Sequence, residues 1–180
     1  MELHRILCFL IPAIPIISIF TAITVILDFN IPENSIRELG RLNTTANMFN
    51  YSLILAGILG IFLSSMIYFK VSNALGRIAL SFLITSYAFT TLIGVFPLGT
   101  ELHSSLCLGL LVSILLSMSL LTGYLNSTNT NLSIFNAILL FFGSIALIYN
   151  IFYAKNMIGA EILGLFCFTI WHFTVLVRLS

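Results

Sequence analysis

Residues 51–69 read YSLILAGILGIFLSSMIYF, a run of nineteen residues without a charged side chain. At about 1.5 Å per residue, an α-helix of this length can cross the hydrocarbon core of a bilayer, which is about 30 Å thick. The run lacks the strict polar–apolar alternation of a membrane β-barrel strand. It therefore predicts a transmembrane helix.

Five further apolar runs fill most of the chain, and short polar connections separate them. The six predicted helices cover approximately residues 6–27, 51–69, 78–98, 104–125, 132–153 and 157–177. A backbone in lipid must satisfy its own hydrogen bonds, which favours helices of this length. We expect one all-α domain over residues 1–180, an integral membrane bundle of six transmembrane helices.

The composition supports a lipid environment. Hydrophobic residues make up 59% of the chain and charged residues 7%, whereas a soluble domain averages about 25% charged residues. The net charge of +1 argues against nucleic acid as a partner. The three cysteines stand singly inside apolar runs, which is typical of small core residues. The expected partners are membrane lipid and other membrane subunits.

The basic residues suggest an orientation in the cell membrane. Six helices place both termini on one side, together with four of the seven Lys and Arg residues. The excess of basic residues on that side predicts cytoplasmic termini. Four of the six acids, Asp28, Glu33, Glu38 and Glu101, fall on the opposite side.

The connection from Asp28 to Asn50 is the longest in the chain and carries five of its thirteen charges. Residues Asn34–Leu42 could form a short amphipathic helix, with Ile36, Leu39 and Leu42 turned toward lipid or toward the bundle. A loop of this length is either functional or packed as a cap.

Glu161 lies about one turn inside the last predicted helix, where a carboxylate is costly unless it is paired, neutralised or hydrated. It could join His103, Glu101 and Asp28, which are predicted on the same side of the membrane, in a polar site at the outer rim. Alternatively, Glu161 reaches interfacial water or pairs with Lys155. The sequence defines no metal motif among these residues, and we expect no metal.

His172 follows Glu161 by eleven residues, which places both on nearly the same helix face about 16 Å apart. They could form a proton path through a water chain, or His172 could simply hydrogen-bond a neighbouring helix. A haem would need axial ligands at matched depths, which the three histidines do not supply. We therefore expect no cofactor.

Several short segments in order resemble a known family. They are Ile36-Arg-Glu-Leu-Gly40, Met48-Phe-Asn50, Leu92-Ile-Gly-Val-Phe-Pro97 and Leu102-His103. This order resembles a prokaryotic six-helix membrane family known as domain of unknown function 998. The resemblance implies that Gly40, Asn50, Gly94, Pro97 and His103 are the marked positions, all on one side of the membrane. The chain has Arg37-Glu38 where that family has Ser-Asp, and no activity carries over.

Three functions remain open from the sequence. The first, a non-catalytic small subunit or accessory component of a larger membrane complex, is favoured by few deep polar groups, short loops and small-residue faces at Gly57/Gly60 and Ala160/Gly164. Alternatively, the chain could be a membrane enzyme or a lipid-binding or ligand-binding protein with a polar site at the outer rim. It could also be a proton-coupled carrier that uses Glu161 and His172.

Overall fold

A computed structural model describes residues 2–25, 35–41, 45–127, 129–152 and 158–179. The all-α expectation is confirmed, with six long helices and one short 3-10 helix. The elements are α1 (Glu2–Val25), η1 (Ile36–Gly40), α2 (Ala46–Lys70), α3 (Ala74–Val95), α4 (His103–Asn126), α5 (Thr130–Phe152) and α6 (Ile158–Leu179). The predicted ends at Leu27, Tyr153 and Met157 lie outside the described residues.

The helices have the length and composition of membrane spans. Five of them, α1, α2, α3, α4 and α6, are long and apolar enough to cross a bilayer. Helix α5 is also apolar and has 23 residues, and its described apolar stretch is Thr130–Ala146. Large apolar side chains such as Phe20, Tyr51 and Phe69 are exposed on the outside, as expected for a surface that faces lipid. The chain is a multi-pass membrane protein.

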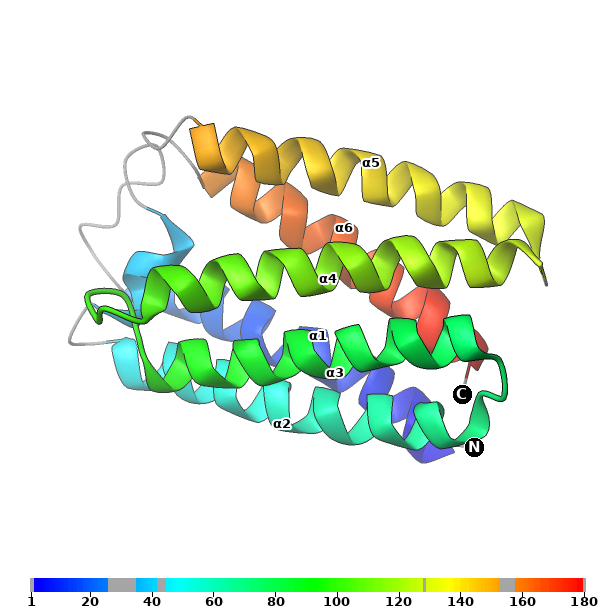
Figure 1. Cartoon of the computed structure of the whole chain (residues 1–180). Coiled ribbons are helices and arrows are strands. Elements are labelled where there is room, and N and C mark those ends of the chain that lie inside the picture. Colours follow the sequence, from blue (N-terminus) through cyan, green and yellow to red (C-terminus); the bar gives the residue numbers. More distant parts are fainter. Residues whose placement is uncertain (1, 26–34, 42–44, 128, 153–157, 180) are drawn as a thin grey trace.

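The helices run along a common direction, with the two termini at one end of the bundle and η1 at the other (Figure 1). We call these the terminal end and the capped end. The connections from α2 to α3 and from α4 to α5 lie at the terminal end, and the connection from α3 to α4 lies at the capped end (Figure 1). The alternating direction of the helices follows from these short connections.

Helices α2 and α3 approach each other closely because glycines of α2 face α3. A Cβ atom on Gly57 would lie 2.7 Å from the Tyr87 carbonyl oxygen, and one on Gly60 would overlap the Tyr87 ring. Small residues allow this kind of close contact between membrane helices. These two glycines therefore serve packing within the chain.

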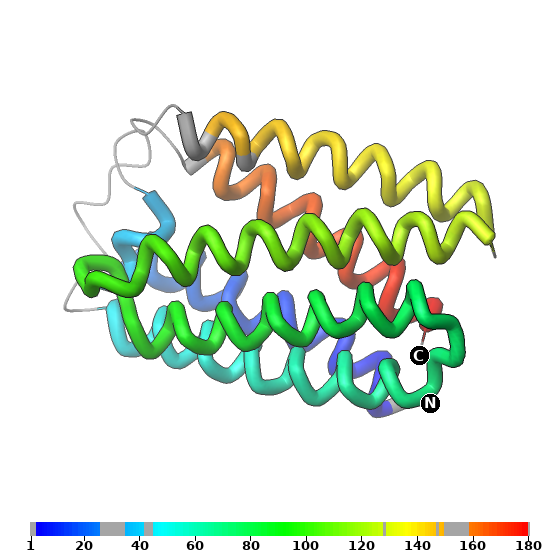
Figure 2. Tube along the Cα trace, viewed as in Figure 1, coloured from blue at the N-terminus to red at the C-terminus, as the bar shows by residue number. Residues whose placement is uncertain are grey.

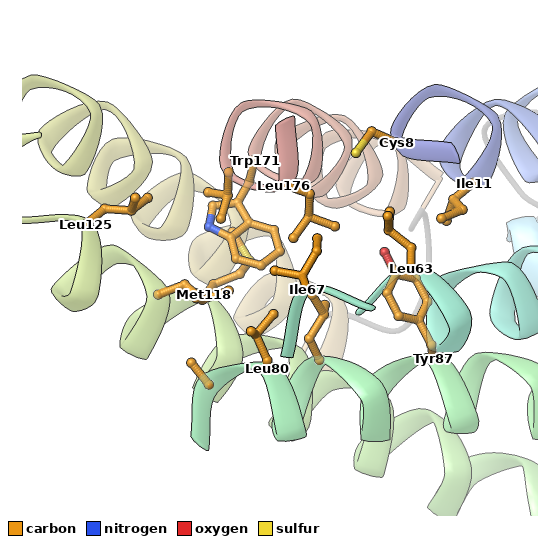
Figure 3. Close-up of a cluster of buried hydrophobic side chains, with 14 of the residues drawn as sticks. Cys8, Ile11, Leu63, Ile67, Leu80, Tyr87, Met118, Leu125, Trp171 and Leu176 are labelled. Atoms are coloured by element: carbon orange, nitrogen blue, oxygen red, sulfur yellow. The ribbon is translucent and has the colours of Figure 1, made fainter. Parts of the chain in front are cut away.

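The main core fills the terminal half of the bundle. Trp171, Val175 and Leu176 of α6 are completely buried in it. Trp171 and Leu176 lie among apolar side chains of α1, α2, α3 and α4 (Figure 3). A second, smaller cluster lies beneath η1 and contains Ile19, Ala22, Ile36, Leu39 and Phe49. The capped half is thus closed by η1, and its packing differs from that of the terminal half.

Helices α4 and α5 diverge from their connection toward the capped end (Figure 2). Helix α6 crosses behind α4 on a diagonal, and α5 packs along α6 (Figure 2). Helices α4 and α5 are thus farther apart at the capped end than at the terminal end (Figure 2).

Candidate functional site

A cavity of about 340 Å³ lies inside the capped half of the bundle. All six long helices and η1 contribute to its wall, which is mostly apolar. Pro12 and Pro15 of α1 and the small residues Gly143, Ala146 and Gly164 of α5 and α6 are part of it. The cavity is at the small end of the range of ligand sites, roughly 300–1,000 Å³.

The charged groups of the cavity lie where η1 covers it. Glu161, in the first turn of α6, accepts a hydrogen bond from the Ile36 backbone N–H at 2.6 Å. Its other oxygen accepts from Arg37 Nε at 3.1 Å, which makes an ion pair between α6 and η1. The Glu161 side chain is 11% exposed and that of Arg37 39%. One carboxylate therefore satisfies a backbone donor of η1 and holds the cap over the cavity.

Helix α2 holds the other end of η1. The Asn50 side-chain amide donates to the Gly40 carbonyl at 3.0 Å, and the Thr45 hydroxyl donates to the Leu39 carbonyl at 3.3 Å. A Cβ on Gly40 would lie 2.6 Å from Asn50 Oδ1, so a side chain there would displace the Asn50 amide that binds the cap. The cap is thus bound on two sides, by α6 and by α2.

His103 begins α4 and is almost completely buried. Its Nδ1 lies 3.0 Å from the Phe96 carbonyl oxygen. Because a carbonyl oxygen only accepts, Nδ1 carries a proton, and Nε2 is an acceptor when the ring holds that single proton. Nε2 lies 3.5 Å from Cys107 Sγ, one turn further along α4. Both side chains line the cavity with Arg37 and Glu161.

A second polar pair lies deeper in the bundle. The Tyr87 hydroxyl of α3 and His172 Nδ1 of α6 are 2.5 Å apart, and both side chains are buried. Tyr87 lines the cavity. In the described part of the chain, His172 Nε2 makes no hydrogen bond of ordinary geometry.

The structure brings only some of the predicted rim residues together. His103 and Glu161 share the cavity, whereas Glu101 is exposed in the turn before α4. Asp28 and Lys155 lie outside the described residues. In the described part of the loop, the residue that joins Glu161 is the cation Arg37 and not an acid.

The predicted proton path from Glu161 to His172 stays a prediction. The structure places Glu161 at the cap and His172 beside Tyr87, with the cavity wall between them. Within the described ranges, His, Cys, Asp and Glu side chains form no group of three that could hold a metal ion.

Sequence reasoning missed three residues of the cavity: Arg37, Tyr87 and Cys107. Cys107 carried a readable signal, because a cysteine four residues after a histidine shares its helix face. No sequence signal pointed to Arg37 or Tyr87. Their partners are 124 and 85 residues away in the sequence.

The positions marked by the family resemblance lie together at the capped end. Asn50 bonds Gly40, and a Cβ on Gly94 would lie 2.6 Å from the Asn50 carbonyl oxygen. Asn50, Pro97 and His103 line the cavity. Residues 9–178 match the family described as "Protein of unknown function (DUF998)". The chain belongs to the DUF998 family.

DUF998 membership covers all six long helices and agrees with the expected family. No curated protein and no solved structure matches the chain. The family description names no activity, so the function of this DUF998 chain has to be argued from its cavity.

Proposed function

We propose that the chain binds an amphipathic membrane lipid, with an acyl chain in the cavity and the headgroup at the cap. The observation that carries the proposal is the distribution of groups along the cavity. Its wall is mostly apolar, and its charged groups, Arg37 of η1 and Glu161 of the first turn of α6, form an ion pair at the capped end. A lipid has the same arrangement of apolar and polar parts.

Selection of the ligand then depends on the polar end. A lipid tail that moves from the bilayer into an apolar cavity exchanges one apolar environment for another, so the transfer itself contributes little. Hydrogen bonds at the cap and the fit of the tail have to supply the affinity. Arg37 and Glu161 carry opposite charges, so a headgroup without net charge fits them better than a strongly anionic one.

The chain offers a matched pair of variants on one helix. Gly164 lines the cavity, and a Cβ there would meet its nearest atom at 4.0 Å, so a larger side chain would grow into the open space. Gly159 has no atom within 4 Å of such a Cβ, is exposed and does not line the cavity. Gly164→Leu should fill the cavity, and Gly159→Leu should leave it open.

The test is native mass spectrometry of the protein purified in mild detergent, with extraction and quantification of the bound lipid. We expect wild type and Gly159→Leu to retain about one lipid of uncharged or zwitterionic class and Gly164→Leu to lose it. Equal lipid content in Gly164→Leu and wild type, with both folded, would contradict the proposal.

We also propose that the protein lies in the cell membrane of a prokaryote with both termini in the cytoplasm. The excess of Lys and Arg on the side of the termini supports this orientation. The cap and the charged end of the cavity would then lie at the outer surface. The role of a subunit in a larger complex, the first of the three functions open from the sequence, stays a prediction. Gly57 and Gly60 give it no free small-residue face, because both contact α3.

A further inference from the structure

Two side chains of the cavity have the chemistry of a nucleophile and its base. Cys107 Sγ lies 3.5 Å from His103 Nε2, and His103 Nδ1 lies 3.0 Å from the Phe96 carbonyl oxygen. A nucleophile, a base and a group that orients the base are the three parts of a side-chain arrangement for covalent catalysis. The orienting group here is a backbone carbonyl.

The hydrogen bond to Phe96 sets the role of the imidazole. With the proton on Nδ1, the free electron pair of Nε2 points at the thiol, which can donate its proton there. After the transfer, both nitrogens of the imidazolium are donors, and each has an acceptor in the Phe96 oxygen and the thiolate. Each nitrogen of the ring therefore has a hydrogen-bond partner both before and after the proton transfer.

Cys107 differs from the other two cysteines in its exposure and in its contact with a histidine. Cys8 and Cys167 are buried, and Cys107 is partly exposed. Among the described residues, Cys107 is the cysteine whose sulfur has a hydrogen-bond contact with a histidine ring nitrogen. Its position on the cavity wall places the sulfur beside any acyl chain that the cavity holds.

We propose that Cys107 is an acyl acceptor that takes the acyl group from an ester of the lipid in the cavity, with His103 as general base. This inference rests on the proposed function. His103 Nε2 removes the thiol proton while the sulfur attacks the ester carbonyl carbon. The carbon–sulfur bond forms, the carbon–oxygen bond of the ester breaks, and the proton on Nε2 passes to the departing alkoxide. The products are an S-acyl cysteine and the free alcohol.

The probes are p-nitrophenyl acetate and p-nitrophenyl decanoate, applied to the full chain in detergent. Release of p-nitrophenolate gives the rate, and intact and peptide mass spectrometry identifies the acylated residue. We expect acylation at Cys107, faster with the decanoate than with the acetate. Cys107→Ser should abolish the thioester, and Cys8→Ala, at a cysteine that does not line the cavity, should leave the rate unchanged.

His103→Gln should lower the rate about 100-fold or more, because general-base catalysis typically contributes about 10²–10⁴-fold. If His103→Gln does not fold, the wild-type protein still tests the proposal, because peptide mass spectrometry shows which of the three cysteines carries the acyl group. Acylation at Cys8 or Cys167 before Cys107, or an unchanged rate in folded His103→Gln, would overturn the proposal.

Chain length separates this inference from the proposed lipid binding. Gly164→Leu should slow acylation by the decanoate more than acylation by the acetate, because the longer chain occupies more of the cavity. Fast acylation of Cys107 by the acetate, without a preference for the decanoate, would support Cys107 as a nucleophile and contradict lipid binding in the cavity. A bound lipid together with no acylation of Cys107 by either ester would support lipid binding and contradict the role of Cys107 as a nucleophile.

Discussion

At the scale of single residues, Glu161 has the clearest structural task. It accepts from the Ile36 N–H and from Arg37, and thereby joins α6 to a cap that is distant in the sequence. A carboxylate at this depth needs such partners because lipid does not solvate charge. The same two contacts keep the side chain at the capped end of the cavity.

Two substitutions separate the charge of Glu161 from its hydrogen bonds. Glu161→Gln keeps an oxygen for the Ile36 N–H and loses the ion pair, whereas Glu161→Leu loses both. We expect Glu161→Leu to lower the free energy of unfolding by about 1–3 kcal/mol and Glu161→Gln to lower it less. Thermal unfolding in detergent measures the difference, and identical melting temperatures for both variants and wild type would contradict this role.

The position of Glu161 was readable from the sequence as a carboxylate inside an apolar helix. Its partner was not, because Lys155 is nearer along the chain and Arg37 is 124 residues away. His103 was likewise predicted at the rim. Its bond to Phe96 depends on the turn between α3 and α4, where Gly99 adopts a φ of +105°.

At the scale of the elements, α2 and α3 form the tightest helix pair in the described structure, and glycine makes it possible. Gly57 and Gly60 place the α2 backbone against Tyr87 and Thr91 of α3. This contact also positions the Tyr87 ring, which reaches both the cavity and His172. The packing of two helices and the wall of the cavity thus depend on the same side chain.

Gly57→Ala should force α2 and α3 apart, because the new Cβ would lie 2.8 Å from the Thr91 backbone nitrogen. Overpacking of this kind costs about 1–3 kcal/mol. Gly123→Ala on α4 is the control, since a Cβ there has no atom within 4 Å. We expect a lower melting temperature in detergent for Gly57→Ala alone. A drop of equal size in both variants would show that the α2–α3 contact is not the cause.

The short helix η1 shows what periodicity can establish for a loop. The sequence predicted a short helix with Ile36 and Leu39 on its apolar side, and both side chains are buried in the bundle. Leu42 lies outside the described residues. Which surface the apolar side would meet, lipid or protein, depended on the arrangement of α1 and α2.

At the scale of the whole molecule, the bundle has two different halves. The terminal half is packed around Trp171, and the capped half encloses the cavity. Exposed polar residues mark both ends, with Glu101 at the capped end and Ser127 at the terminal end. The orientation of these halves decides from which side of the membrane the cavity is reached.

Labelling with a membrane-impermeant maleimide tests the orientation in intact cells. In a chain whose three native cysteines are changed to serine, Glu101→Cys should react in intact cells. Ser127→Cys should react only after the membrane is permeabilised, because it lies at the end that carries the termini. The reverse pattern would place the termini outside the cytoplasm.

The sequence alone determined the class of the protein, its six helices and its family resemblance. These properties follow from local composition, since about twenty apolar residues in a row have few structures open to them in lipid. The tertiary structure decided which polar groups meet. The contacts of Arg37 with Glu161 and of Tyr87 with His172, and the cavity that His103 and Cys107 line, join residues of separate helices. The distances between these residues depend on how the helices pack, so a local sequence pattern does not predict them.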